Sequence, residues 1–189
     1  MTLVLASRSP RRTEILNALG VEHIIVEPDV DEVGEGDPEE LVVENARRKA
    51  SAGLSEAPEG SLVLGADTEV VVDGRVLGQP GGADEARAHL EALSGRTHTV
   101  LTGVVVLGRG SEGEKHQERS GVAQSQVTFR DLDDATLNLY LDSGEWRGRA
   151  GAYAIQGLGS ILIERLDGDF SNVVGLPVPL LLELAPELL

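Results

Sequence analysis

Arginine and serine side chains gather near the start of the chain, in the segment LASRSPRR at residues 5–12. Ser9 followed by Pro10 is typical of a helix start, with Ser9 as the cap and Pro10 as the first helical residue. Arg11 and Arg12 then fall in the first turn, where a cation is disfavoured by about 0.3–1 kcal/mol because the helix end is itself partly positive. A bound phosphate reverses that sign, since backbone N–H groups, a hydroxyl and two guanidinium groups would converge on it. The alternative is that both arginines turn away and pair with nearby acids.

Asp67 interrupts an apolar pattern, between LVLGA at residues 62–66 and VVV at residues 70–72. We expect a polar interruption at Asp67 and Thr68, with the carboxylate at the end of a strand beside the core. A partly desolvated carboxylate there could act as a general base or as a metal ligand. It could equally be a turn aspartate that accepts hydrogen bonds from the backbone two residues on.

Residues 27–40 hold eight acidic residues and no basic one, which by default indicates a solvated loop. The pair Asp31-Glu32 stands out because it follows an expected strand at residues 23–27, where a carboxylate can face a cleft. Paired carboxylates beside a phosphate site suit Mg²⁺, which takes one or two carboxylates together with phosphate oxygens and water. Lys49 lies near the end of an expected helix, where a lysine usually offsets the helix dipole.

The segment GEWRGRAGAYAIQGLG at residues 144–159 is too rich in glycine for regular structure. Glycine lets a backbone approach a ligand closely, and a buried amide at Gln156 could read a base edge through its donor and acceptor. The alternative is a turn that faces the core, with Trp146 and Tyr153 as packing anchors.

The elements that would position these residues alternate between strand and helix at first, with antiparallel hairpins inserted later. The pattern predicts a mixed α/β sheet, divided into two lobes by a cleft. Asp73-Gly74 signals a hairpin turn. Helices are expected over residues 10–19, 38–53, 83–94, 132–142 and 175–185, and strands over residues 2–6, 23–27, 62–66, 70–72, 97–109 and 121–130.

Composition excludes several classes of protein. The formal charge of −16 argues against a broad nucleic-acid surface, and 3% aromatic residues leave little for base stacking. The chain has no cysteine, so it has no disulfide and no thiolate site. We find no GxSxG or Walker-type motif and no signal or membrane segment, which predicts a soluble cytoplasmic protein without a membrane partner. The four histidines are too far apart for metal spacing: His23, His89, His98 and His116.

Taken in order, these motifs resemble the Maf proteins, a family of nucleoside triphosphate pyrophosphatases. The resemblance covers nearly the whole chain, and seven ordered motifs make it far more specific than any one motif. The matching segments are LASRSPRR, Asp31-Glu32, ARRKA at residues 46–50, GADT at 65–68, THTVLTGV at 97–104, AGAYAIQG at 150–157 and NVVGLP at 172–177.

The resemblance implies one domain over residues 1–189 with an ITPase-like fold, a mixed twisted α/β sheet flanked by helices in two lobes around a central cleft. It implies hydrolysis of a nucleoside triphosphate to the monophosphate and pyrophosphate, with Mg²⁺ or Mn²⁺ as cofactor. A homodimer is also plausible on this basis. Water attack on phosphorus needs a base, a metal and cations near the developing charge, and the residues above supply such groups.

The resemblance also assigns roles to residues. Asp67 would be the general base, and Glu32 and Asp67 would hold the metal. The residues expected to bind substrate are Ser9, Arg11, Arg12, Lys49, Thr68, Gln79 and Gln156. Arg8 remains without a role and is expected at the surface.

Within the family, the branch acting on dTTP and UTP has arginine after Ser-Pro, threonine after the catalytic aspartate and glutamine in the Tyr-x-Ile-Gln-Gly motif. Arg11, Thr68 and Gln156 stand at those places, whereas the branch preferring 7-methyl-GTP differs there. The resemblance therefore favours dTTP and UTP, with modified pyrimidine nucleotides as a further option.

One position departs from the family pattern. The segment LGQP at residues 77–80 has Gln79 where the family usually has lysine. Glutamine can still donate a hydrogen bond to phosphate, but without a charge it loses about 1–3 kcal/mol of stabilisation. We expect weaker activity or a shifted preference.

Two other functions compete with hydrolysis. Because the family is linked with inhibition of septum formation, the chain could bind nucleotide as a signal and contact a division partner without essential catalysis. A nucleotidyltransferase would also begin with a strand and an arginine-containing phosphate loop, but no GxGxR loop follows the first strand.

Overall fold

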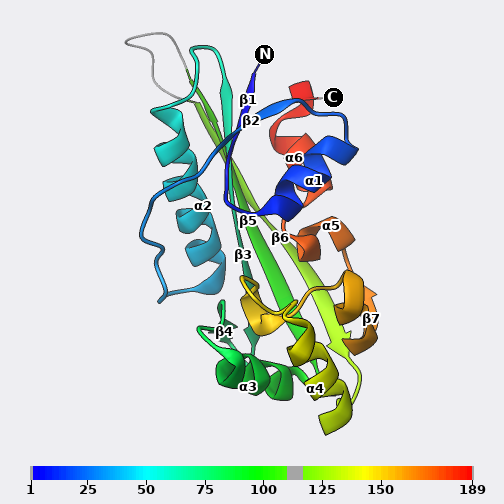
Figure 1. Ribbon diagram of the computed structural model, residues 1–189. Helices are drawn as coiled ribbons and strands as arrows, with labels where there is room; N and C mark the ends of the chain where they lie inside the picture. The colour runs from blue at the N-terminus through cyan, green and yellow to red at the C-terminus, as the bar shows by residue number, and fades with distance from the viewer. Residues whose placement is uncertain (1, 110–116, 189) are drawn as a thin grey trace. The chain divides into compact units, whose positions relative to one another are not determined.

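The computed structural model describes residues 2–109 and 117–188 (Figure 1). The chain divides into two compact units. The first unit comprises Met1–Asp67, Thr102–Ala123 and Gly175–Leu189, and the second comprises Thr68–Leu101 and Gln124–Val174. His116 lies outside the described residues.

In the described part of the chain the strands form a seven-stranded sheet in the order β2-β1-β3-β5-β6-β7, with β4 paired to β3. β1 runs parallel to both β2 and β3, whereas β4 is antiparallel to β3 and β7 is antiparallel to β6. The prediction of a mixed sheet flanked by helices is confirmed. The strands are β1 Leu3–Ala6, β2 His23–Val26, β3 Leu62–Val72, β4 Arg75–Leu77, β5 Thr97–Gly108, β6 Gln117–Phe129 and β7 Ile163–Asp167.

In the first unit, helices cover both faces of the sheet (Figure 1). Successive strand residues point to opposite faces, so Leu3 and Leu5 of β1 pack with α1 (Pro10–Ala18) and α6 (Val178–Leu184). Val4 and Ala6 pack with α2 (Pro38–Leu54) on the other face. Burial on both faces explains why β1 reads as a continuous apolar run rather than an alternating one.

Two glycines let α2 lie directly on the sheet. A Cβ atom on Gly65 of β3 would stand 2.1 Å from the carbonyl oxygen of Ala46, and one on Gly103 of β5 would stand 2.4 Å from that of Val42. Only a residue without a side chain fits either place. The backbone of α2 therefore lies close against β3, which brings side chains of α2 within reach of that strand.

The helix starts follow their predicted signals. Asp37 caps α2 by accepting hydrogen bonds from the backbone N–H groups of Glu39 and Glu40. Ser9 occupies the cap position of α1 and Pro10 its first turn, but the Ser9 side chain makes no cap hydrogen bond. Gly20 ends α1 with a φ of +73°, as predicted for a residue in the left-handed region.

The C-terminal segment differs from the prediction of one helix over residues 175–185. A short helix, α5 (Phe170–Val174), comes first, and α6 begins only at Val178. Gly175 separates them with a φ of +123°, and Pro177 at the cap of α6 has no N–H group to continue an earlier helix. A last 3₁₀ turn spans Pro186–Leu188.

The second unit packs α3 (Ala83–Leu93) and α4 (Asp134–Ser143) on an aromatic core. Trp146 and Tyr153 are buried in that core, so the prediction that they are packing anchors is confirmed. The glycine-rich segment that contains them forms 3₁₀ turns at Ala150–Ala152 and Gly157–Leu162 before β7. The Asp73-Gly74 hairpin is also confirmed, with both residues at positive φ.

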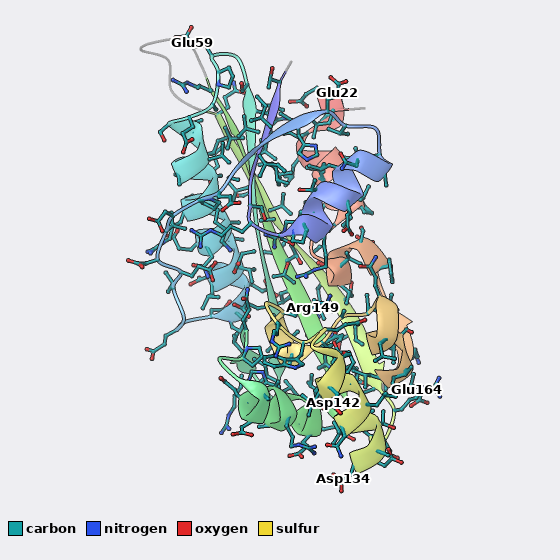
Figure 2. The ribbon with its side chains drawn as sticks, in the orientation of Figure 1. Glu22, Glu59, Asp134, Asp142, Arg149 and Glu164 are labelled. Carbon is teal, nitrogen blue, oxygen red and sulfur yellow. The ribbon has the colours of Figure 1, made fainter. Side chains whose placement is uncertain are left out.

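Much of the excess negative charge lies in exposed positions. All eight acids of residues 27–40 are exposed, as expected for a solvated segment. Glu22, Glu59 and Asp134 are also exposed, and their side chains lie at the outside of the ribbon (Figure 2). This distribution makes the buried Asp67, described next, unusual among the acids that the structure describes.

Candidate active site

Asp67 lies inside β3 and is only 5% exposed. The prediction of two strands with a polar interruption at Asp67 and Thr68 is wrong, because β3 is continuous from Leu62 to Val72. A strand is held by its backbone, so it can carry a carboxylate wherever that carboxylate finds partners. The pairing of β1 with β3 reaches only as far as Gly65, which leaves Asp67 two residues beyond the paired end of β1.

The carboxylate of Asp67 is held by α2. Lys49 donates from Nζ to Asp67 Oδ1 over 2.6 Å, and Asn45 donates from Nδ2 to Asp67 Oδ2 over 3.3 Å. Asn45 and Lys49 are four residues apart, so they share one face of the helix. Both carboxylate oxygens of Asp67 thus bind side chains of α2, and the turn-aspartate interpretation does not describe this residue.

Lys49 also binds Glu32 from the loop after β2. Its Nζ lies 2.7 Å from Glu32 Oε1, and its side chain is buried while that of Glu32 is about half exposed. One ammonium group therefore stands between two carboxylates, one in a strand and one in a loop. Lys49 does more than offset a helix dipole, as the family resemblance implied.

Arg12 is the buried cation of the segment LASRSPRR. Its Nε donates to the carbonyl oxygen of Gly175 over 2.7 Å, and its Nη1 donates to Ser7 Oγ over 3.1 Å. Burial lowers the pKa of Arg12 to about 10, although the negative charge of Asp67 acts in the opposite direction. The guanidinium group stays charged at neutral pH and contributes a fixed positive charge to the environment of Asp67.

The other members of LASRSPRR divide between the site and the surface. Ser9 is half-buried, and its backbone N–H donates to Ser7 Oγ over 3.1 Å. Arg11 lies in the first turn of α1 and is half-buried, as the spacing predicted. Arg8 is exposed, 3.6 Å from Asp29, and so is the surface residue that we expected.

Three of the predicted substrate-binding residues belong to the second unit. Thr68 follows Asp67 directly and is half-buried, and Gln79 is exposed in the segment after β4. The expectation that the Gln156 amide is buried is wrong, because Gln156 is exposed at the start of a 3₁₀ turn. Glu145 fixes that turn by accepting hydrogen bonds from the N–H groups of Leu158 and Gly159.

Sequence reasoning missed Ser7, Asn45 and Gly175. Ser7 precedes the recognisable Ser-Pro pair, and Gly175 acts through its carbonyl oxygen, which no residue type signals. Asn45 carried a usable signal, since it stands one helical turn before Lys49 on the face that carries that lysine.

The donor set fits a divalent cation that arrives with a phosphate. Among the described residues, no group of three or more His, Cys, Asp or Glu side chains is arranged to hold a metal ion by itself. Glu32 and Asp67 nevertheless converge on one point, the Nζ atom of Lys49, over 2.7 and 2.6 Å. Mg²⁺ commonly uses one or two carboxylates and takes its remaining ligands from phosphate and water.

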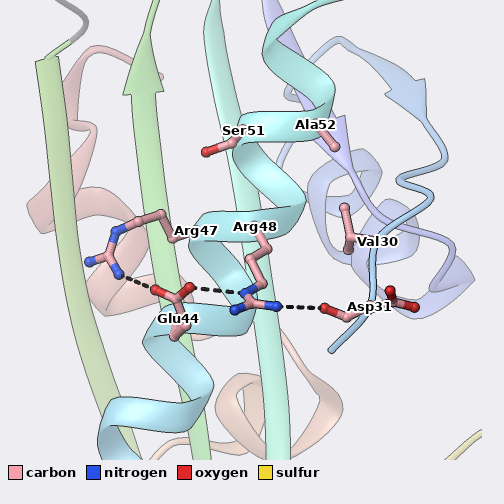
Figure 3. A pocket seen from close by; sticks show the side chains of 7 residues that line it. All are labelled: Val30, Asp31, Glu44, Arg47, Arg48, Ser51 and Ala52. Carbon is pink, nitrogen blue, oxygen red and sulfur yellow. Dashed lines mark hydrogen bonds and ion pairs between the residues drawn. The ribbon is translucent and has the colours of Figure 1, made fainter. Parts of the chain in front are cut away.

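A separate hollow lies on the outer side of α2, where the loop after β2 crosses the helix (Figure 3). Its arginines are already paired: Glu44 lies 2.8 Å from Arg47 and 2.9 Å from Arg48. Arg48 also donates to the carbonyl oxygen of Asp31 over 3.0 Å. The side chains that line the hollow therefore form an ion-pair network, and the hydrogen bond from Arg48 joins the loop after β2 to α2.

Comparison with known proteins supports the sequence resemblance. The family model described as "Maf-like protein" matches residues 2–188. The dTTP/UTP pyrophosphatase of Caldanaerobacter subterraneus subsp. tengcongensis is 42% identical over 185 residues, which are 97% of this chain and 87% of that protein. The dTTP/UTP pyrophosphatase of Alkalilimnicola ehrlichii is 44% identical over 183 residues, which are 93% of this chain and 87% of that protein.

Solved structures resemble the chain more distantly. A nucleoside-triphosphatase / dITP/XTP pyrophosphatase from Mycobacterium abscessus aligns with a TM-score of 0.43 and 20% identity, over 70% of this chain and 76% of that one. This likeness is too low to support an argument about fold or function. Within the described residues, every helix is too short or too polar to cross a bilayer. The match over residues 2–188, together with relatives above 40% identity along almost the entire chain, shows that the chain belongs to the Maf family.

Proposed function

We propose that this protein is a nucleoside triphosphate pyrophosphatase that hydrolyses dTTP and UTP to the monophosphate and pyrophosphate. The observation that carries the proposal is the buried Lys49, whose ammonium group joins Asp67 to Glu32 close to the charge of Arg12. Relatives named dTTP/UTP pyrophosphatase align over 93–97% of this chain, which supports the same chemistry.

The triphosphate is held by the cations of the first unit. Arg12 is fixed by Ser7 and Gly175, so its guanidinium group is already oriented before a substrate arrives. Arg11 and Ser9 lie at the same N-terminus of α1, where backbone N–H groups favour an anion. These three side chains are proposed to bind phosphate oxygens, and Lys49 is proposed to join them.

Asp67 is proposed to act as the general base. It takes a proton from a water molecule whose oxygen attacks the α-phosphorus, and the bond from that phosphorus to the bridging oxygen of pyrophosphate breaks. Lys49 and Asn45 hold the carboxylate in a single orientation, which favours proton transfer along one direction. Mg²⁺ or Mn²⁺, held by Glu32 and Asp67, would neutralise charge on the phosphate oxygens when bound.

Base selection is assigned to Arg11, Thr68 and Gln156, the residues that match the dTTP/UTP branch. Gln156 is exposed, so its amide is available to a ligand without first being uncovered. Gln79 is proposed to contact phosphate through a neutral amide, at the place where the family resemblance leads us to expect a lysine. Modified pyrimidine nucleotides share the base edge that this set would recognise, and they remain within the proposal.

The proposal extends to the organisation of the chain. Residues 1–189 are proposed to act as a single pyrophosphatase domain, in the cytoplasm and as a homodimer. Regulation of septum formation without catalysis is less favoured, because a purely binding cleft does not need a buried lysine between two carboxylates. A nucleotidyltransferase is not supported either, since neither the family model nor the named relatives point to that activity.

The test is a panel of nucleoside triphosphates, canonical and modified, assayed with Mg²⁺ and with Mn²⁺. The assay separates pyrophosphate from orthophosphate as the first product. We expect pyrophosphate, with dTTP and UTP giving the largest kcat/KM. Orthophosphate as the first product would exclude the proposed reaction. Equal kcat/KM for all nucleotides in the panel would exclude the proposed preference for dTTP and UTP.

A further inference from the structure

Asn45 of α2 is almost fully buried, at 1% exposed, and its amide is engaged on both sides. The Oδ1 atom accepts a hydrogen bond from the N–H of Val33 over 2.7 Å. The Nδ2 atom donates to the carbonyl oxygen of Val33 over 3.0 Å and to Asp67 Oδ2 over 3.3 Å. The Asn45 side chain therefore binds both the N–H and the C=O of Val33 in the loop, and also a carboxylate oxygen of Asp67 in β3.

The position of Val33 gives this contact its meaning. Val33 directly follows Glu32 in a loop without regular structure, so the backbone of Glu32 is fixed within one peptide unit of the Asn45 amide. Hydrogen bonds to both the N–H and the C=O of Val33 hold the two peptide units on either side of that residue, whereas a single contact would leave one of them free to rotate. The Glu32 side chain, about half exposed and on a loop, depends on such an anchor for its direction.

Asn45 and Lys49, on adjacent turns of α2, each join the loop after β2 to Asp67 of β3. Lys49 joins Glu32 to Asp67 through charge, and Asn45 joins Val33 to Asp67 through its amide. The connection of Lys49 ends on side-chain atoms that a substrate or metal would also use. The connection of Asn45 ends partly on backbone atoms, so it can persist when the charged groups change partners.

We infer that Asn45 is a positioning residue that holds the loop carrying Glu32 and the carboxylate of Asp67 in one fixed arrangement. This inference rests on the proposed function for its kinetic consequence, but not for its structural one. Arg48 also ties the loop to α2, through the carbonyl oxygen of Asp31, but the Arg48 side chain is 42% exposed. Water competes for such an exposed contact, so the buried amide of Asn45 contributes more to holding the loop against α2.

The test compares Asn45→Ala with Asn45→Asp in the full chain, with Ser51→Ala on the exposed side of α2 as the matched control. Alanine removes all three hydrogen bonds. Aspartate keeps an oxygen that accepts from the Val33 N–H, but it has no N–H to donate to Asp67. Thermal unfolding first establishes the temperature at which each variant is folded, and kinetics are measured below it.

For hydrolysis of dTTP, we expect kcat to fall about 10–100-fold in both Asn45 variants, the range typical for groups that orient ligating carboxylates. KM should stay within roughly threefold, because the hydrogen bonds of the Asn45 side chain go to Val33 and Asp67, neither of which is proposed to bind the triphosphate directly. A merely structural role predicts instead that activity follows the loss of thermal stability. If kcat of either variant stays within threefold of the unsubstituted protein, the inference is wrong.

Hydrogen exchange of the Val33 amide gives a second measurement that needs no turnover. We expect about tenfold faster exchange in Asn45→Ala, but retained protection in Asn45→Asp and in Ser51→Ala. Unchanged Val33 exchange in Asn45→Ala would overturn the inference even if the protein proves to be a pyrophosphatase. Conversely, an unsubstituted protein that does not hydrolyse nucleotides would refute the proposed function, while Val33 exchange would still decide whether Asn45 anchors the loop. Should Asn45→Ala fail to fold, kcat of Asn45→Asp decides the question.

Discussion

At the scale of single residues, the site depends on charges that are buried in pairs. Lys49 and Asp67 are both buried, and the Nζ atom of Lys49 lies 2.6 Å from Asp67 Oδ1. A buried charge is tolerated when an opposite charge and hydrogen bonds accompany it, and its removal leaves the partner uncompensated. A substitution at Lys49 or Asp67 that keeps the hydrogen bonds should therefore lower kcat more than it weakens the binding of nucleotide.

Asp67→Asn should abolish most turnover while nucleotide binding survives. The amide has nearly the size of the carboxylate and its oxygen can still accept from Lys49, but it cannot take a proton from water. Loss of a general base typically costs a factor of about 10²–10⁴ in rate. The checks are kcat for dTTP and calorimetric binding of dTTP, with Asp29→Asn in the exposed acidic segment as the control. Turnover above about a tenth of the original rate would exclude Asp67 as the base.

Gln79→Lys should raise kcat/KM for dTTP, because it supplies the charge that the family resemblance leads us to expect at this position. Gln79 is exposed, and solvent screens an exposed charge, so we expect a gain of about 3–10-fold rather than the full effect of a charge-assisted hydrogen bond. Gln117→Lys adds the same charge at another exposed glutamine and should have little effect. The explanation fails if Gln79→Lys lowers kcat/KM for every nucleotide in the panel.

At the scale of elements, α2 is the organising part of the first unit. Its apolar face packs on β1 and β3, and the same face presents Asn45 and Lys49 to Asp67. The close approach at Gly65 fixes the distance between the helix and the strand, and so fixes whether these polar contacts can form. Packing and chemistry are coupled through one glycine.

Gly65→Ala should strongly destabilise the protein. A Cβ atom at this position would stand 2.1 Å from the carbonyl oxygen of Ala46, so α2 would have to move away from β3. Overpacking of this kind costs about 1–3 kcal/mol and more where backbone is involved, so we expect roughly 3 kcal/mol in the free energy of unfolding measured with urea. Gly34→Ala is the matched control, since a Cβ atom there meets nothing within 4 Å. Equal stability of the two variants would show that α2 yields easily.

Elements with a local signal could be predicted from the sequence, and elements defined by distant partners could not. The Ser9-Pro10 and Asp37-Pro38 helix starts and the Asp73-Gly74 hairpin carry their signals within a few residues. The continuity of β3 through Asp67 could not be seen, because it depends on partners in α2 about 20 residues earlier. For the same reason the contacts of Lys49 and Asn45 with Asp67 were not predicted, although the family resemblance had named Lys49 as a substrate-binding residue.

At the scale of the whole molecule, a buried histidine links stability to pH. His98 is 2% exposed and its Nε2 lies 2.8 Å from the hydroxyl oxygen of Tyr153 in the core of the second unit. Burial lowers the pKa of His98 from 6.5 to about 4 and raises that of Tyr153. The folded protein therefore keeps His98 neutral at a pH where the unfolded chain would already protonate it.

Stability should fall as the pH drops from about 6.5 to about 4. In this window the unfolded state binds the proton and the folded state does not, so protonation favours unfolding. The lowered pKa of His98 corresponds to roughly 3 kcal/mol over the whole window. Urea unfolding at several pH values, for the unsubstituted protein and for His98→Gln, measures the difference in slope. An identical pH dependence of both proteins would show that another group is responsible.

The division into units has a consequence for how this chain folds while it is being synthesised. The first unit is assembled from the first, middle and last stretches, and Leu3 and Leu5 share a core with Leu176 and Leu181. At typical translation speeds of about 5–20 residues per second, these partners emerge roughly 10–40 seconds after the strand that awaits them. During that interval β1 has an apolar face without its final cover. Newly made chains should therefore depend on chaperones that shield early strands, and loss of the last dozen residues should expose that face permanently.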